Sequence, residues 1–421
     1  MASYAFQSRQ HYPRNVEEFN QRFPDSAYNT IHTLSEANRK ASGSRWNVKH
    51  LEACRVLLSQ PQSRPPHPQP HHLTVLEPYL ERARAQLQRA PGVYQSLVAV
   101  TPKGLKQCSH QELRAVGNRF GAFYTRLADV TRLPLPEPQT RPARVTRPPD
   151  RPDYVSGEGL GLSSPLGTEL SGHSQPSSFS LSESDPVEQS EHMLRIQHET
   201  VTAGMASEFI SVIVDLCSEQ TQPESRIEFT SAPTTYTMES QWLRTVCQDD
   251  GSFIRRIKSR LHGLWISMGH NLAILEAKAL YQSWSEDEDV AQLSTNVLAQ
   301  QTCEIVSSIF QRLDIGDDVD DLSRKDRQYV LYRPQVFHVT ETLTLNSLFL
   351  ISAHQTTLTF LHTTIEKDYL DYLRSDKPVD ILPFLALSTS AQFDIGKISE
   401  RVEAAIGIMS LVSFLDETEE V

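Results

Sequence analysis

The sequence lacks any long hydrophobic run. No window of its 421 residues approaches the roughly 18 consecutive apolar residues that span a membrane. The opening segment, MASYAFQSRQHYPRN, also lacks the apolar stretch that marks a signal peptide. We therefore expect an intracellular protein, nuclear or cytoplasmic, that is neither secreted nor attached to a membrane.

Cysteine is scarce, and several easily recognised site motifs are missing. The five cysteines form no CxxC pair and no Cys/His spacing of a zinc site, so we expect them to be reduced and mostly buried. The sequence also has no GxSxG motif and no Walker-type phosphate-binding loop. These absences argue against a structural zinc site, a serine-nucleophile enzyme and a P-loop enzyme.

The net charge of -12 hides an uneven distribution. Residues 1–180 carry 22 basic against 14 acidic side chains, a net of +8, and residues 181–421 carry 18 against 38, a net of -20. The basic part permits contact with a polyanion. The acidic part argues against broad electrostatic wrapping of nucleic acid, so any contact there must be local.

Composition divides the chain into three parts. Residues 1–133 have apolar side chains at helical spacing and predict a largely helical, partly disordered region. Residues 134–186 are rich first in Pro and Arg and then in Gly and Ser, and have too few apolar side chains to offset the entropy cost of ordering. They predict a disordered linker. Residues 187–416 combine long amphipathic segments with segments rich in Thr, Phe and Tyr, and predict a mixed α/β domain.

The segment 272–280, LAILEAKAL, is the most informative in the chain. It has apolar residues on both faces of a strand, as a central strand does when helices cover both sides of its sheet. Alternation places Glu276 and Lys278 on one face, in line with Leu272 and Ile274. Burying such a pair is costly unless each group is paired, hydrated or bound to metal. The segment alone fits an ion pair at a strand end as well as a metal site.

Two flanking features favour the metal site. Upstream, Asp249 and Asp250 precede Gly251 and a short strand, so one carboxylate can project from the start of a neighbouring strand. Downstream, residues 290–313 have the apolar stripe of a helix. Two carboxylates can bind Mg²⁺, and a nearby lysine can orient the attacking water and help to deprotonate it.

This ordered set resembles the PD-(D/E)XK, or restriction-endonuclease-like, nuclease superfamily, and more narrowly a divergent domain of that type in fungal proteins. The matching pieces follow one another as IEFTSAP, DDG, LAILEAK, LAQQTCE, LFLISAHQTTLTFLH, KDYLDYL and FLALSTSAQFDIGKISERVEAAIGIMSLV. The usual proline before the first aspartate is missing. The resemblance implies an α/β core in which helices flank a central mixed sheet.

The resemblance also implies roles for individual residues. Asp250 would be the strand-borne metal ligand, Glu276 the second ligand and Lys278 the catalytic lysine. The main-chain carbonyl of Ala277 would be a further ligand. Asp249 is the alternative to Asp250, because the sequence does not say which carboxylate faces inward.

Two helical side chains would complete the implied site. Many members of the superfamily use an acidic residue on the first helix, for which Glu208 is the candidate, with a solvated surface glutamate as the alternative. Gln300 aligns with the glutamine of the helix that follows the motif. Gln301 is its alternative, because helical spacing places it closer to the apolar stripe.

One basic cluster stands out in the acidic part of the chain. Arg255, Arg256, Lys258 and Arg260 follow Asp250 closely, and we consider them candidate contacts to a phosphate backbone. A plain solvated hairpin is the alternative.

The expected function is hydrolysis of phosphodiester bonds in nucleic acid by a nuclease that needs Mg²⁺ or Mn²⁺. DNA is favoured over RNA as the partner, and the oligomeric state is open. The alternative is a nuclease-like fold without catalytic activity that serves as a nucleic-acid-binding or protein-interaction module.

Overall fold

A computed structural model of the chain describes residues 12–26, 28–59, 71–133, 186–218, 224–240, 242–259, 263–278, 283–285, 290–292, 294–325, 347–375, 377, 379 and 382–418. Those from 1–133 and 196–421 belong to one compact unit, and residues 186–195 belong to a second. The predicted linker, 134–186, lies outside the described residues except for its last position.

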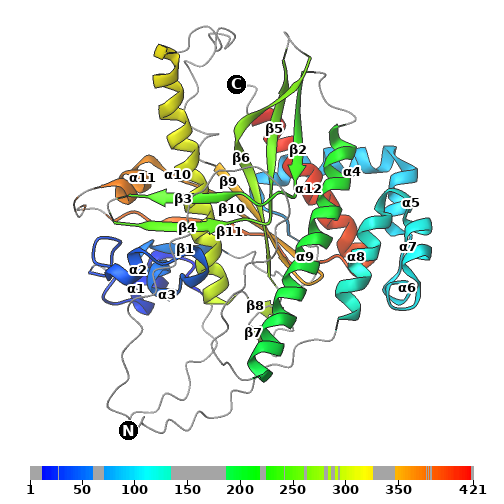
Figure 1. Cartoon of the computed structure of the whole chain (residues 1–421), viewed down its shortest axis with the longest axis horizontal. Helices are drawn as coiled ribbons and strands as arrows, with labels where there is room; N and C mark the ends of the chain where they lie inside the picture. The colour runs from blue at the N-terminus through cyan, green and yellow to red at the C-terminus, as the bar shows by residue number, and fades with distance from the viewer. Residues whose placement is uncertain are drawn as a thin grey trace. The chain divides into compact units, whose positions relative to one another are not determined.

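The first unit is built on an eight-stranded mixed sheet (Figure 1). Its strands are β1 (Val56–Ser59), β2 (Ser225–Thr230), β5 (Gly251–Lys258), β6 (Trp265–Lys278), β9 (Ser347–His354), β10 (Thr357–Thr364), β11 (Leu385–Thr389) and β12 (Phe393–Asp394). The order is β1-β11-β10-β9-β6-β5-β2, with β12 paired to β10. β5 is antiparallel to both β2 and β6, whereas β6 and β9 are parallel. The predicted α/β fold with a central mixed sheet is thereby confirmed.

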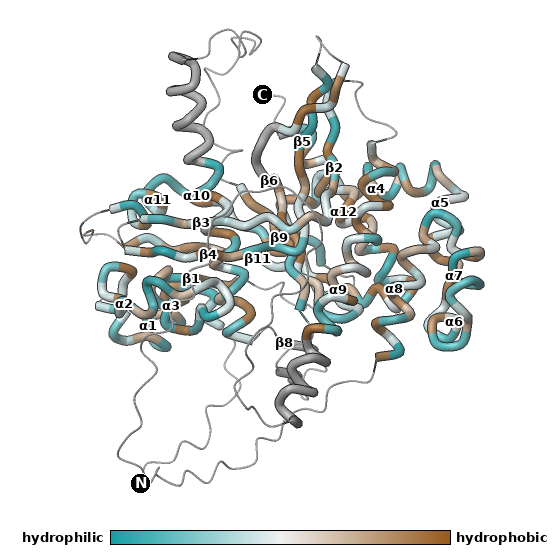
Figure 2. Tube along the Cα trace, viewed as in Figure 1, coloured by the Kyte–Doolittle hydropathy of each residue, from teal (hydrophilic) through white to brown (hydrophobic). Residues whose placement is uncertain are grey.

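Helices cover both faces of this sheet. The three long ones are α9 (Pro186–Ser218), α10 (Thr295–Lys325) and α12 (Ile398–Thr418). Phe209 of α9 and Ile408 of α12 share one apolar core with Ala273 of β6. Ile305 of α10 packs in a second core with Ile274 of the same strand. Two covered faces explain why β6 is apolar on both sides, and Figure 2 shows the hydrophobic residues along the central strands.

The part of α9 from Ile196 to Ser218 is long and apolar enough to cross a membrane, by length and composition only. Half of its most apolar window, 50%, is buried inside the protein. Ile210 and Ile213 are among the residues that pack in the first core. The helix therefore has the apolar stripe of a core helix.

Leu272 lies on the opposite face from the one that alternation predicts. It packs in the core of Ala273 and not in that of Ile274. The pairing of β5 with β6 shifts its register between Phe253 and Ile254. Such a bulge inserts an extra residue and interrupts the alternation. The alternation holds from Ala273 onward, which includes the Glu-x-Lys segment.

The helix predicted over residues 290–313 begins and ends later than expected. Residues Val290–Gln292 form the short strand β8, which pairs with β7 (Ser283–Ser285). The helix α10 begins only after Ser294, whose Oγ accepts a hydrogen bond of 3.2 Å from the N–H of Val297. A serine that accepts from the first turn is a preferred start of a helix.

The N-terminal region is largely helical and belongs to the same unit. Its α-helices are α1 (Val16–Arg22), α2 (Glu36–Arg39), α3 (Val48–Ala53), α4 (Glu77–Arg89), α5 (Pro91–Val98), α6 (Pro102–Gln107), α7 (His110–Gly117) and α8 (Gly121–Arg132). Its strand β1 extends the sheet by pairing in parallel with β11. Leu87 of α4 packs in the core that Ile408 of α12 also joins.

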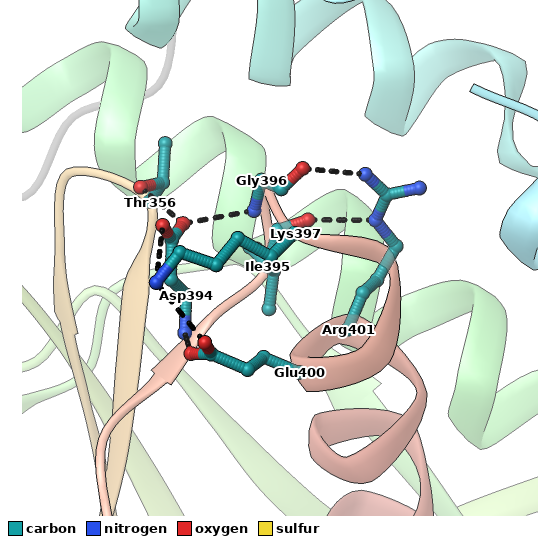
Figure 3. Close-up of polar contacts among 7 residues, drawn as sticks. All are labelled: Thr356, Asp394, Ile395, Gly396, Lys397, Glu400 and Arg401. Atoms are coloured by element: carbon teal, nitrogen blue, oxygen red, sulfur yellow. Dashed lines mark hydrogen bonds and ion pairs between the residues drawn. The ribbon is translucent and has the colours of Figure 1, made fainter. Parts of the chain in front are cut away.

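The buried Arg401 ties this region to α12. Its guanidinium donates hydrogen bonds to Ile395 O at 2.6 Å and to Gly396 O at 3.1 Å, at the start of α12 (Figure 3). It also donates to Leu97 O and Val100 O of the N-terminal region. A charged group without solvent contact needs such partners, so Arg401 fixes the two segments against each other.

Candidate functional site

The candidate site lies where the start of β5 meets the end of β6. Antiparallel pairing places Gly251 opposite Leu275, so Asp250 comes beside the last residues of β6. The N–H of Asp250 donates to Leu275 O at 2.9 Å. Oδ2 of Asp250 accepts a hydrogen bond of 2.7 Å from the N–H of Ala277. Asp250 is therefore held against the segment that carries Glu276.

Glu276 and Lys278 lie on the same face, as their spacing predicts. Nζ of Lys278 forms an ion pair with Oε1 of Glu276. Glu276 is 1% exposed, whereas the side chain of Lys278 is 19% exposed. The pair thus runs from the protein interior toward the surface.

Asp249, the alternative to Asp250, faces a different part of the protein. It is buried, and its Oδ1 accepts a hydrogen bond of 2.7 Å from the N–H of Thr234. Its Oδ2 accepts from the hydroxyl of Tyr236 and, at 3.4 Å, from Nδ2 of Asn271. Tyr236 belongs to the hairpin of β3 (Thr235–Glu239) and β4 (Arg244–Gln248). Asp249 therefore fastens this hairpin to β6, and Asp250 is the carboxylate beside Ala277.

Gln300 of α10 contacts Glu276 of β6. Its Nε2 donates a hydrogen bond of 2.6 Å to Oε1 of Glu276. Gln301, the alternative, is fully buried and donates at 2.5 Å to Oγ of Ser352 on β9. Gln300 therefore contacts Glu276, whereas Gln301 contacts Ser352 on the neighbouring strand β9.

Glu304 also belongs to the group, although the sequence analysis did not select it. It is 0% exposed, and its Oε1 accepts a hydrogen bond of 3.0 Å from Nε2 of Gln300, four residues earlier on α10. One signal was available in the sequence. Glu304 stands in the apolar stripe directly before Ile305 and Val306, where a charged residue is unexpected.

The carboxylate that α9 contributes is Glu199, which acts electrostatically on both Asp250 and Lys278. The predicted Glu208 lies further along the same helix and is half-buried. At about 1.5 Å of rise per residue, roughly 13 Å along the helix axis separate the two glutamates. Glu199, and not Glu208, is thus the α9 carboxylate whose charge acts on Asp250 and Lys278.

Arg255 is not available as a phosphate contact, because its side chain points inward. It is buried, and its guanidinium donates to Leu415 O at 2.5 Å and to Asp416 O at 3.2 Å. These are carbonyls near the end of α12, where a cation is favourable. Arg255 therefore serves the fold.

The other three residues of the basic cluster differ in position. Nε of Arg256 lies 2.7 Å from Oε2 of Glu228 on the neighbouring strand β2, and the same carboxylate also pairs with Arg226. Lys258, at the end of β5, is exposed. Arg260 lies outside the described residues. Within the described part of the cluster, Lys258 is the residue best placed to meet a phosphate.

The carboxylates of Asp250, Glu276 and Glu304 interact electrostatically with one lysine, Lys278. Burial raises the pKa of Glu276 to about 7, and the attraction of Lys278 opposes this shift. Burial, followed by the charge of Glu276, raises the pKa of Glu304 well above its usual range. Burial works against the charged form of Lys278, but Glu276 and Glu304 outweigh it and raise the lysine pKa. Burial raises the pKa of Asp250, and the hydrogen bond from the N–H of Ala277, followed by the charge of Lys278, opposes this shift. A bound cation would favour the ionised form of these carboxyl groups.

The geometry can provide oxygen ligands for such a cation. Lys278 contacts Oε1 of Glu276, and the N–H of Ala277 contacts Oδ2 of Asp250. Each of these contacts uses one oxygen of a carboxylate and does not involve the other oxygen. Because a strand residue presents its N–H and C=O to the same neighbour, the carbonyl of Ala277 also faces Asp250. Such oxygens suit Mg²⁺.

No arrangement of three or more His, Cys, Asp or Glu side chains among the described residues forms a metal site by itself. The side chains that could hold an ion at this place are those of Asp250 and Glu276, with the carbonyl of Ala277 beside them. Mg²⁺ commonly keeps several waters and is bound through one or two carboxylates. The set of ligands is consistent with that preference.

No family model matches the sequence, and no curated protein shows significant similarity to it.

Proposed function

We propose that the chain is a metal-dependent nuclease with a PD-(D/E)XK, restriction-endonuclease-like core, which hydrolyses phosphodiester bonds in nucleic acid and prefers DNA. The hydrogen bond between Ala277 and Asp250 carries the proposal. It joins the two halves of the motif, which are 27 residues apart. The ion pair of Glu276 and Lys278 lies directly beside this hydrogen bond.

The order of the elements supports the same interpretation. The helix α9 precedes three antiparallel strands, β2, β5 and β6, and α10 then leads to β9, which is parallel to β6. Asp250 precedes the second of these strands, the Glu-x-Lys segment ends the third, and α10 carries Gln300. This is the order of motifs that the resemblance implies.

Each residue of the group has a chemical role in the proposed reaction. Bound Mg²⁺ or Mn²⁺ would polarise the phosphate and lower the pKa of a bound water. Asp250 and Glu276 would hold the ion through the oxygens that the protein contacts leave available. Lys278 reaches the more exposed side, where its ammonium can orient the attacking water and stabilise negative charge on the phosphate.

The test is cleavage by the purified full-length chain. Supercoiled plasmid, linear duplex DNA, single-stranded DNA and RNA would each be incubated with Mg²⁺ or Mn²⁺, and in parallel with EDTA. We expect cleavage with either metal, DNA to be cleaved faster than RNA, and no cleavage with EDTA.

Two variants make the test specific. Glu276→Gln keeps the size of the side chain and removes a proposed ligand, so we expect cleavage to fall at least about 100-fold. Glu228→Gln is the matched control, because Glu228 is also a strand-borne glutamate with a cationic partner. Equal activity of Glu276→Gln and the wild type would contradict the proposal. Nucleic-acid binding without cleavage under any condition would favour the interaction module instead.

A further inference from the structure

The amide of Gln300 lies between two buried carboxylates. Its Nε2 donates to Oε1 of Glu276 at 2.6 Å and to Oε1 of Glu304 at 3.0 Å. An amide nitrogen carries two hydrogens, so each carboxylate receives one. Gln300 thus connects Glu304 to the proposed metal ligand.

The two acceptors determine the orientation of this amide. The nitrogen and oxygen of a glutamine side chain are distinguished by their hydrogen-bond partners. In the structure the NH₂ group, and not the carbonyl oxygen, faces the Oε1 atoms of Glu276 and Glu304. Glu304 therefore keeps the NH₂ group, and not the carbonyl, directed at Glu276.

The burial of Glu304 needs a physical reason. The residue is 0% exposed, and within the described part of the chain its Oε2 has no hydrogen-bond partner. A buried carboxylate is costly, and an apolar side chain of similar volume often serves stability at least as well. The neighbouring Ile305 and Val306 show that α10 carries apolar side chains here.

We propose that Glu304 is a positioning residue of the candidate site. It holds the amide of Gln300 so that Gln300 and Lys278 together engage Oε1 of Glu276 and leave Oε2 to the metal ion. This inference rests on the proposed function, because it assigns Glu304 a role only if a cation binds at Asp250 and Glu276.

Mn²⁺ titration of the full-length chain, followed by calorimetry and by electron paramagnetic resonance, tests the inference without relying on activity. Glu304→Leu removes the acceptor and keeps a similar volume. Loss of a residue that orients a ligand typically costs about 10- to 100-fold in metal affinity, and we expect a loss in that range. Glu304→Gln can still accept from Gln300, and its affinity should stay within about 3-fold of wild type.

A second variant separates positioning from general stability. Gln300→Leu should lower Mn²⁺ affinity as much as Glu304→Leu does. The double variant should lose less than the sum of the two single losses, because Gln300 and Glu304 share one hydrogen bond. Circular dichroism and thermal unfolding would confirm that each variant is folded, and Gln300→Leu tests the same contact if Glu304→Leu does not fold.

Three outcomes would overturn the inference. Wild-type affinity in folded Glu304→Leu would reduce Glu304 to a structural residue. Equal losses in Glu304→Gln and Glu304→Leu would make Glu304 a ligand in its own right. A wild-type chain that binds no Mn²⁺ would also remove the proposed function, which distinguishes this failure from the first two.

Discussion

The N–H of Ala277 donates a hydrogen bond of 2.7 Å to Oδ2 of Asp250, although the two residues are 27 positions apart. The contact orients the carboxylate from the side of the main chain. It places Asp250 beside Glu276, whose own Oε1 is held by Lys278 and Gln300. The geometry of the group thus depends on the register between β5 and β6.

The neighbouring aspartates should respond differently to substitution. Asp250→Asn can still accept from Ala277, so the free energy of unfolding should change by less than about 1 kcal/mol. Its Mn²⁺ affinity should nevertheless fall at least about 10-fold. Asp249→Ala leaves the N–H of Thr234 and the hydroxyl of Tyr236 without their acceptor and should cost about 2 kcal/mol or more. Urea unfolding and Mn²⁺ titration measure both effects, and a reversed pattern would show that Asp249 is the ligand.

Stability should depend on pH through Glu276. Burial raises its pKa from 4.5 to about 7, so the folded state retains a proton that the unfolded state has released. This contribution is fully present below about pH 4.5 and is lost as the pH rises through about 7, with a slope of at most about 1.4 kcal/mol per pH unit for one proton. Urea unfolding in EDTA between these values should show a steeper decline in the wild type than in Glu276→Gln, which keeps the raised pKa values of Asp249 and Glu304. Parallel curves would contradict the shift.

Gly251 should not tolerate a side chain. Its φ is +156°, and an added Cβ would lie 2.8 Å from both Cζ of Phe229 and the carbonyl oxygen of Thr230. Thr230 belongs to the paired strand β2, so its main chain cannot retreat without disturbing the sheet. Gly251→Ala should therefore destabilise the fold by about 2 kcal/mol and weaken Mn²⁺ binding by moving Asp250. Wild-type values in both measurements would contradict this role.

Arg255 and Lys258 belong to the predicted phosphate-binding cluster, but we expect substitution of Arg255 to affect stability and substitution of Lys258 to affect DNA binding. Arg255→Ala removes hydrogen bonds to buried carbonyls and should lower the free energy of unfolding by about 2 kcal/mol. Lys258→Ala removes an exposed charge, so it should leave stability within about 0.5 kcal/mol. It should weaken DNA binding and reduce the salt dependence of that binding by about one ion. DNA binding that is insensitive to Lys258→Ala would exclude this residue from the interface.

Local periodicity predicted the part of the site that lies on one strand. Glu276 and Lys278 share a face because side chains alternate along β6, and the structure adds their ion pair. The same rule failed at Leu272, because a bulge in the pairing with β5 interrupts the alternation. The sequence of one strand does not reveal where its pairing with a neighbouring strand contains a bulge.

Contacts between distant segments lay beyond the reach of sequence reasoning. Arg255 has the same charge as its neighbours, and only the position of the end of α12 shows that it is buried. Helical spacing pointed to Gln301 as the inner glutamine, which is correct for burial, but contact with Glu276 depends on how α10 crosses β6. The pairing of β1 with β11 joins residues near 56 and 385, for which periodicity offers no signal.

Catalysis by Lys278 is the central claim, and one comparison tests it most directly. Lys278→Met keeps both proposed metal ligands, so Mn²⁺ affinity should stay within about 10-fold of wild type, while metal-dependent cleavage of plasmid DNA should fall at least about 100-fold. Lys397→Met is the control, because Lys397 also pairs with a glutamate but lies at the start of α12. Cleavage by Lys278→Met at the rate of the wild type and of Lys397→Met would contradict the account.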